Sequence, residues 1–339
     1  MTKSSTSTPH LLPVHFLGTG SYLPERIVPN SELETMVDTS DHWIATRTGM
    51  RERRLAADDQ ATSDLAGAAA KKALESSDVS PDDIDLILVG TSTPDMLFPN
   101  TACFVQKQIG AGNATCMDIE AACSGFLYTM EVAKQFVQSG TKKRALIIGA
   151  EKMSCITDWE DRSTCVLFGD AAGAAILGPG PGRGIIHTVT GSDGTLADLL
   201  KVPGGGSRNP FRPETADQRL QYIKMEGQEV FKNAVANMTR SAKQLLAESG
   251  LSMGDVSTII PHQANARIIK AVGQRLGATA DQVYVNVDKY GNTSAASVIV
   301  ALDEAARSGA VNPGDIIMFV VFGAGFTWGA SLVEWGGGQ

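Results

Sequence analysis

Apolar residues occur along this chain in short continuous runs, which alternate with longer stretches rich in Ala, Lys and Glu. This alternation predicts a mostly parallel sheet that is covered by helices. We expect helices at 63–77 and 231–250, the second ending at Gly250, because glycine is favoured just after a helix. Four apolar runs predict buried strands, at 84–91, 144–151, 256–263 and 315–322.

The chain resembles itself at a distance of about half its length. LESSDVSPDDIDLILVGT at 74–91 aligns without gaps on LAESGLSMGDVSTIIPHQ at 246–263, which is a shift of 172 residues. Two weaker matches follow in the same order: GAGNATCMDIEAACSG with GATADQVYVNVDKYGNTSA, and FGDAAGAAILG with FGAGFTWGASL. The regular alternation of helices and strands in any α/β protein would produce part of this similarity. Three matches in one order favour an internal duplication.

Composition is typical of a globular protein and excludes several classes of function. The 339 residues are 43% hydrophobic, which suffices for two domains or one duplicated domain. The five cysteines include no C-x-x-C pair and no Cys/His cluster, which indicates a reducing compartment and argues against structural zinc. With no cleavable signal and no long uncharged apolar run, we expect a cytoplasmic protein that does not insert into membranes. The net charge of -8 argues against nucleic acid as a partner.

Three reactive side chains come near the ends of predicted strands. Cys123, in IEAACSGFLY, and Asn292, in YGNTSA, occupy nearly equivalent places in the two repeats, and His262 ends the strand predicted at 256–263. Because ligands bind at the carboxyl ends of strands in open α/β sheets, we expect these three side chains to face one region. Taken alone, Cys123 also suits a buried cysteine that only packs.

The surroundings of Cys123 suit a thiol nucleophile. Cys123 precedes a predicted helix, whose unpaired N–H groups favour the thiolate, and Ser124 and Gly125 are small enough to admit an acyl group. The turn Gly-Ala-Gly at 323–325 follows a buried strand, so its backbone N–H groups can face a developing oxyanion. A tight turn that merely needs glycine would have the same sequence.

Six motifs occur in an order that resembles one known family: GTGSYLPE, DTSDHWIATRTGMRER, AACSGF, PHQANARI, GNTSAAS and FGAGFTWG. From about residue 14 to the end, the chain resembles β-ketoacyl-acyl-carrier-protein synthase III of the thiolase superfamily. The resemblance implies an α/β fold of the thiolase-like, duplicated, five-layered αβαβα type. It implies an N-terminal half at 1–185 that carries Cys123, and a C-terminal half at 186–339 that carries His262 and Asn292. It also implies a homodimer without a cofactor, acyl-CoA being a substrate.

The implied reaction is a decarboxylative Claisen condensation of a short acyl-CoA, such as acetyl-CoA, with malonyl-acyl-carrier protein. This reaction opens type II fatty-acid synthesis. Cys123 is then the nucleophile that takes the acyl group from CoA as a thioester. His262 and Asn292 are neutral donors to the malonyl thioester carbonyl, where an enolate forms on loss of CO2, and no carboxylate is required. The N–H groups of Cys123 and Ala324 form a second oxyanion hole, at the Cys123 thioester.

The resemblance also implies residues that bind the substrates. Trp43 and Arg47 resemble the family's adenine-stacking pair, although by themselves they suit a core aromatic residue and a helix-surface charge. The implied CoA-binding set is Trp43, Arg47, Arg162, Gly227, Phe231 and Asn265. Docking of the acidic carrier protein is implied for Arg267, Lys232, Lys270 and Arg275. For Lys270, a solvated helix face is an equal alternative.

The implied acyl pocket contains Phe98 and Phe322. Phe98 resembles the residue that crosses the dimer to close the pocket, and its bulk favours a short primer such as acetyl. The sequence departs from the family at Ser124, where many members have Ala, and at Ala324, where many have Gly. The segment 202–218, VPGGGSRNPFRPETADQ, is longer and richer in Gly and Pro than expected, and predicts a mobile loop.

Three alternative functions have to be weighed. A related condensing enzyme of secondary metabolism, or one that joins two acyl chains, would share Cys123, His262 and Asn292 but use another primer or acceptor. A degradative thiolase needs a second cysteine as base near the C-terminus, and no cysteine follows Cys165. A non-catalytic acyl-binding or scaffold protein would not need all three reactive residues.

Overall fold

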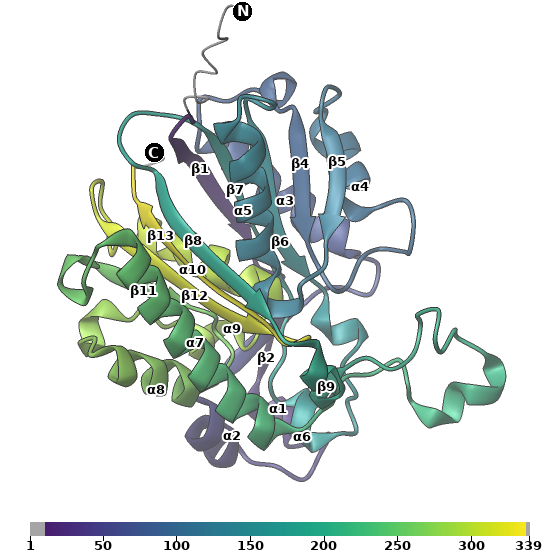
Figure 1. The fold of residues 1–339 in the computed structure, drawn as a ribbon. Helices are drawn as coiled ribbons and strands as arrows, with labels where there is room; N and C mark the ends of the chain where they lie inside the picture. The colour runs from purple at the N-terminus through teal and green to yellow at the C-terminus, as the bar shows by residue number, and fades with distance from the viewer. Residues whose placement is uncertain (1–10, 337–339) are drawn as a thin grey trace, which may run out of the picture.

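Two mixed β-sheets form the centre of the molecule in the computed structural model, which describes residues 11–336 (Figure 1). Residues 1–10 and 337–339 of the two predicted halves lie outside the described residues. The first sheet has the order β1 (Val14–Tyr22), β7 (Ala171–Pro179), β6 (Ala145–Glu151), β4 (Leu86–Gly90), β5 (Thr115–Ile119). The second has the order β11 (Thr258–Pro261), β12 (Ile316–Gly323), β13 (Thr327–Glu334), β8 (Ile185–Ser192).

Helices cover both sheets and also separate them, which gives five layers (Figure 1). The outer face of the first sheet carries α3 (Thr62–Glu75) and α4 (Thr101–Ile109). The layer between the sheets consists of α5 (Gly125–Gln138) and α10 (Ser297–Arg307). The outer face of the second sheet carries α7 (Gly227–Ser249) and α8 (Ala266–Leu276). The αβαβα fold predicted from the sequence is therefore confirmed.

The apolar pattern of the central strands explains this layering. In β4, Leu86 and Leu88 pack against the central helices, whereas Ile87 and Val89 pack on the side of α3. Successive side chains of a strand point to opposite faces, so a strand that is covered on both sides is apolar at every position. The strands predicted at 84–91, 144–151, 256–263 and 315–322 correspond to β4, β6, β11 and β12.

The helix predicted at 231–250 is confirmed as α7, although it begins four residues earlier, at Gly227. It ends where predicted, because Gly250 has a φ of 69° and donates its backbone N–H to the carbonyl of Leu246. The helix predicted at 63–77 is confirmed as α3.

The two sheets repeat one topology. In the first sheet β6 runs parallel to β4 and antiparallel to β7, and in the second sheet β12 runs parallel to β11 and antiparallel to β13. The strand orders β4–β6–β7–β1 and β11–β12–β13–β8 therefore correspond. The counterpart of β5 is reduced to one parallel bridge, between Ile259 and Val283. At a shift of 172 residues, the turn that holds Cys123 corresponds to the turn at Ser294–Ala296, so Asn292 lies just before the equivalent place. The division between residues 185 and 186 stays a prediction.

The remaining elements lie around the layers. The short strands are β2 (Arg26–Pro29), β3 (Glu52–Leu55), β9 (Leu200–Lys201) and β10 (Lys224–Met225). The short helices are α1 (Asn30–Leu33), α2 (Asp41–Thr48), α6 (Arg162–Cys165) and α9 (Val287–Tyr290). The chain between β9 and β10, which includes the predicted loop 202–218, extends away from the body as an arm (Figure 1). Within residues 11–336, none of the helices has the length and apolar character that crossing a bilayer requires.

Candidate active site

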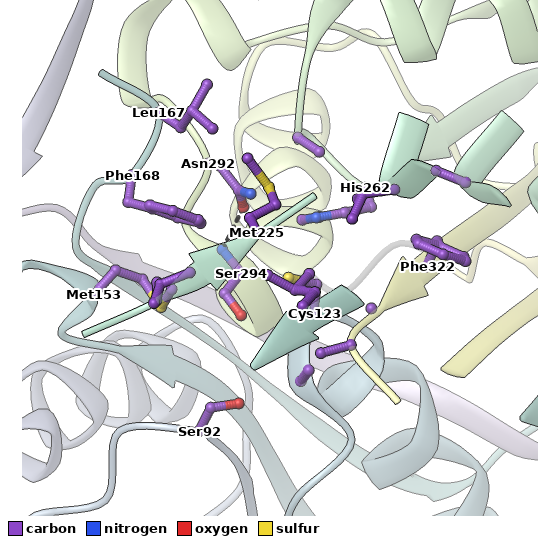
Figure 2. A pocket seen from close by; sticks show the side chains of 18 of the residues that line it. Ser92, Cys123, Met153, Leu167, Phe168, Met225, His262, Asn292, Ser294 and Phe322 are labelled. Carbon is purple, nitrogen blue, oxygen red and sulfur yellow. Dashed lines mark hydrogen bonds between the residues drawn. The ribbon is translucent and has the colours of Figure 1, made fainter. Parts of the chain in front are cut away.

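Cys123, His262 and Asn292 line one cavity of about 410 Å³, which lies where the two halves meet (Figure 2). The structure thus brings together the three side chains that the sequence singled out. The cavity is mostly apolar, and its walls include Leu200, Ile223, Met225, Phe231, Ile268 and Phe322. A cavity of this kind suits a largely apolar ligand, to which a few polar groups are presented.

Cys123 lies in the turn η2 (Ala122–Ser124), which leads into α5. The preceding residue, Ala122, has a φ of 46°, a conformation that residues other than glycine seldom adopt. The end of β12 packs directly against this turn: a Cβ added to Gly323 would lie 2.7 Å from the backbone nitrogen of Cys123. Position 323 therefore has to be glycine, because the turn and the strand approach so closely.

The Cys123 thiol differs from the expected thiolate. Its pKa is raised to about 12, mainly by burial and also by the carboxylates of Glu151 and Glu120, while a hydrogen bond with Ser294 opposes the rise. The N-terminus of α5 does not outweigh these effects. Burial therefore outweighs the predicted effect of the helix N-terminus, and the thiol has to lose a proton when it reacts.

His262 follows the last residue of β11 and is fixed at two points. Its backbone N–H donates to the carbonyl of Val320 (2.8 Å), and its Nδ1 lies 2.6 Å from the hydroxyl oxygen of Ser297. Burial lowers the pKa of the imidazole to about 3, so His262 is neutral near pH 7. A hydroxyl that donates to Nδ1 leaves Nε2 as the protonated nitrogen, so the contact with Ser297 favours an Nε2–H donor.

Asn292 is held by the N-terminal half of the chain and by its own turn. Its backbone N–H donates to the carbonyl of Leu167 (2.8 Å), and its Oδ1 accepts the backbone N–H of Ser294 (2.9 Å; Figure 2). Gly291 permits this approach, because it has a φ of 65° and an added Cβ would lie 2.8 Å from the Leu167 carbonyl. With Oδ1 occupied, the amide nitrogen of Asn292 remains as a donor.

Ala324 lines the cavity beside Cys123, at the turn between β12 and β13. The Thr327 hydroxyl lies 3.0 Å from the carbonyl oxygen of Ala121 and 3.1 Å from that of Ala324. It thereby links the Ala324 turn to the segment that carries Cys123. The two residues predicted to form the second oxyanion hole, Cys123 and Ala324, are neighbours in space.

Carboxyl groups near Cys123 were not predicted. Glu120 lines the cavity and accepts the backbone N–H of Ala122 (2.9 Å). Glu151 lies behind Ser294 and is fully buried. Glu151 ends the strand predicted at 144–151, so the strand-end criterion that selected His262 would have selected it as well. Ser297 stands in the quoted motif GNTSAAS, but its contact with His262 depends on how α10 packs on β11.

The residues predicted to stack on adenine lie together outside the cavity. The guanidinium carbon of Arg162 is 4.8 Å from the centre of the Trp43 ring, and that of Arg47 is 5.1 Å from it. Asn265 joins this cluster to the cavity, because it lines the cavity and its amide donates to the Arg47 carbonyl (3.2 Å). Gly227 and Phe231, at the start of α7, line the cavity too.

The residues predicted for carrier-protein docking lie on the two outer helices of the second sheet, Lys232 on α7 and the other three on α8. The guanidinium carbon of Arg267 is 5.5 Å from the ring centre of Phe231, so this arginine lies near the cavity. Lys232 forms an ion pair with Glu229 (2.6 Å). Lys270 and Arg275 are exposed, and Arg275 lies in the last turn of α8.

The two predicted acyl-pocket residues lie in different surroundings, one in the cavity and one on the surface. Phe322 lines the cavity, and its ring packs on Phe326 with 4.7 Å between centres. Phe98 does not line the cavity of its own chain and is 83% exposed. Its neighbours Met96 and Leu97 are exposed as well.

The chain matches two family models, both of them for parts of one enzyme family. Residues 117–194 match the model of 3-oxoacyl-[acyl-carrier-protein] synthase III, and residues 246–335 match that of its C-terminal part. These two ranges contain Cys123, His262 and Asn292.

Relatives of known name resemble the chain over nearly its full length. The β-ketoacyl-[acyl-carrier-protein] synthase III of Caldanaerobacter subterraneus subsp. tengcongensis is 55% identical over 320 residues, which are 94% of this chain and 97% of that protein. The crystal structure of 3-oxoacyl-[acyl-carrier-protein] synthase III from Aquifex aeolicus is similar with a TM-score of 0.89 and 44% identity, over 95% of this chain and 100% of that one. The priming β-ketosynthase of the R1128 polyketide biosynthetic pathway has a TM-score of 0.91 and 36% identity, over 99% and 100%.

Proposed function

This chain belongs to the 3-oxoacyl-[acyl-carrier-protein] synthase III family, and from that premise we propose that it is the condensing enzyme that opens type II fatty-acid synthesis. A short acyl-CoA, acetyl-CoA in our proposal, condenses with malonyl-acyl-carrier protein. The products are CO2, free CoA and a 3-oxoacyl-acyl-carrier protein. The observation that carries the proposal is the meeting of Cys123, His262 and Asn292 in one apolar cavity.

In the first half-reaction the acyl group moves from CoA to Cys123. The sulfur attacks the thioester carbonyl, the N–H groups of Cys123 and Ala324 stabilise the tetrahedral oxyanion, and CoA leaves. We assign the nucleotide end of CoA to Trp43, Arg47 and Arg162, because these three side chains form a flat cationic cluster. Its pantetheine arm would then pass Gly227, Phe231 and Asn265, which line the way to Cys123.

In the second half-reaction the malonyl thioester carbonyl binds to His262 and Asn292. Loss of CO2 turns this carbonyl into an enolate, so two neutral donors stabilise charge that exists mainly in the transition state. The carbanion attacks the acyl carbonyl on Cys123 and expels the thiolate. The low pKa of His262 suits this role, because a neutral imidazole with a protonated Nε2 donates a hydrogen bond.

The partners follow from the same assignment. We propose that the acidic carrier protein docks at Arg267, Lys232, Lys270 and Arg275, of which Arg267 lies nearest the cavity. No cofactor takes part in these steps. We place the enzyme in the cytoplasm, where its five free cysteines would stay reduced.

We propose a homodimer in which Phe98 of one protomer closes the acyl pocket of the other. Two features support it. Met96, Leu97 and Phe98 form an exposed apolar segment, which is unusual for a monomer surface. Among the described residues, β5 has a strand on one side only, and its free edge can pair with a second copy.

A condensing enzyme of secondary metabolism remains the second candidate. The similarity to the R1128 priming β-ketosynthase, at 36% identity, favours it specifically. Both candidates use the same three residues, so only the primer and the acceptor distinguish them. A series of acyl-CoA primers, each tested with malonyl-carrier protein from a fatty-acid pathway and from a polyketide pathway, separates the two.

The proposal predicts that acetyl-CoA acetylates one thiol, that of Cys123. Intact-mass measurement followed by peptide mapping locates the acetyl group, and Cys123→Ala should take up none. Cys116→Ala is the matched control, because it removes another half-buried thiol outside the cavity. Acetylation elsewhere, or of no residue with any short acyl-CoA, would contradict the proposal.

A further inference from the structure

A buried carboxyl group without an assigned role lies behind the nucleophile. Glu151 is the last residue of β6 and points to the inner face of its sheet, where it is 0% exposed. Its carboxylate accepts hydrogen bonds from four donors: Thr91 Oγ1 (3.2 Å), Thr93 Oγ1 (2.7 Å), Ser294 Oγ (3.0 Å) and the Ser92 backbone N–H, which contacts both carboxylate oxygens (3.2 and 3.1 Å). Three donors come from the N-terminal half, and Ser294 comes from the C-terminal half.

Ser294 lies between this carboxyl group and the thiol. It begins the turn η8 (Ser294–Ala296), which packs against η2, and Figure 2 shows its hydroxyl beside Cys123. Ser294 also has a φ of 49°, like Ala122 in the equivalent turn of the first half. Because so few residues other than glycine adopt this conformation, the fold, rather than the preference of serine, sets the place of the hydroxyl.

The single proton of the Ser294 hydroxyl makes this arrangement directional. While Ser294 donates its one proton to Glu151, its oxygen can accept a proton from the thiol beside it, which gives a path from sulfur to oxygen to carboxylate. We propose that Glu151, acting through Ser294, accepts the Cys123 proton during acyl transfer. This inference rests on the proposed function and deepens its first half-reaction.

The proposed step balances. The Cys123 proton moves to Ser294 Oγ while the Ser294 proton moves to Glu151 Oε1, and a bond forms between the Cys123 sulfur and the acyl carbon. The bond between that carbon and the CoA sulfur then breaks. The proton returns through the same hydroxyl to the leaving CoA sulfur, so that Glu151 ends as a carboxylate and Cys123 as a neutral thioester.

The charges around the site agree with this direction of transfer. Burial raises the pKa of Glu151 to about 7, so near neutral pH the group can both accept and return a proton. His262, with a pKa of about 3, is a poorer acceptor. The other titratable groups facing the pair are Glu120, which raises the pKa of the Cys123 thiol, and Cys155, whose own pKa burial raises to about 11. Acyl transfer should therefore increase as the pH rises through about 7.

Glu151→Gln tests the proposal through the sign of its effect. The Glu151 carboxylate raises the thiol pKa, so removing its charge should speed acyl transfer if Glu151 is only a charged neighbour. The proton transfer predicts the opposite, a loss of about a hundredfold, together with loss of the pH dependence near 7. Rapid-quench measurement of acetyl transfer from acetyl-CoA to Cys123 gives this rate, and alkylation by iodoacetamide at about pH 9 shows that the thiol is intact.

Ser294→Ala is the second variant, needed if Glu151→Gln does not fold. It removes the hydroxyl but keeps the backbone N–H that orients Asn292, so acyl transfer should fall about a hundredfold while malonyl decarboxylation is spared. Thr91→Val is the matched control: it removes a hydrogen bond to the same carboxylate outside the path, and should slow acyl transfer much less.

Acyl transfer as fast in Glu151→Gln or Ser294→Ala as in the unchanged protein would overturn the proton transfer. Failure of the unchanged protein to acylate Cys123 would instead overturn the proposed function.

Discussion

At the scale of single residues, burial decides the chemistry of the site more than charge does. The same desolvation raises the pKa of the Cys123 thiol to about 12 and lowers that of His262 to about 3, so both groups are neutral near pH 7. A neutral thiol needs a proton acceptor to react, whereas a neutral imidazole is ready to donate a hydrogen bond. The two half-reactions therefore place different demands on the two residues.

His262→Ala should slow malonyl decarboxylation by about a hundredfold or more, because the enolate loses one of its two donors. Acyl transfer to Cys123 should fall by less than about tenfold, since the other oxyanion hole serves that step. Release of CO2 from malonyl-carrier protein and acetylation from acetyl-CoA measure the two steps separately.

His15→Ala is the control for this variant, because it also removes a buried imidazole but lies outside the cavity. Equal losses in both half-reactions of His262→Ala would show that its role is assigned wrongly.

At the scale of elements, the close contact between β12 and the turn η2 holds Cys123, the proposed nucleophile, in place. Gly323→Ala would bring a Cβ to 2.7 Å from the Cys123 nitrogen and 3.0 Å from that of Ser124, so the strand and the turn have to separate. We expect acyl transfer to fall at least about tenfold, because the oxyanion donors of Cys123 and Ala324 move apart. Rapid-quench acetylation measures this rate, and thermal unfolding reports the accompanying loss of stability.

Gly112→Ala is the matched substitution, since an added Cβ meets nothing within 4 Å there. Similar acylation rates in Gly323→Ala and the unchanged protein would mean that the contact does not position the thiol.

The elements also show why some features were predictable from sequence and others were not. The strands β4, β6, β11 and β12 are covered on both faces, so each appears as a continuous apolar run. His262 follows β11, Cys123 comes after the less buried strand β5, and Asn292 follows the helix α9 rather than a strand; the internal repeat indicated that the three converge. Ser297 escaped prediction because its role arises from a contact with His262, which joins distant parts of the chain. Glu151 stood at a predicted strand end and could have been selected, but its contact with Ser294 in η8 could not be read from the sequence.

At the scale of the whole molecule, the proposed second protomer accounts for the exposed segment Met96–Leu97–Phe98. Phe98 is 83% exposed here, yet the proposed dimer places it in the partner's acyl pocket, where its bulk would limit the length of the primer. Phe98→Ala should therefore raise the ratio of kcat/KM for hexanoyl-CoA over acetyl-CoA by about tenfold. This is the size of effect expected when the pocket gains space for a few more methylene groups of the primer.

Phe211→Ala separates this effect from the mere loss of an exposed aromatic ring, because Phe211 is 72% exposed on the arm between β9 and β10. If Phe98 bounds the pocket, only Phe98→Ala changes the primer ratio, and sedimentation should still show a dimer, since the free edge of β5 remains available for pairing. A primer ratio that is unchanged in Phe98→Ala would mean that the pocket ends against residues of its own chain, such as Phe322. The preference for short primers would then be set within one protomer.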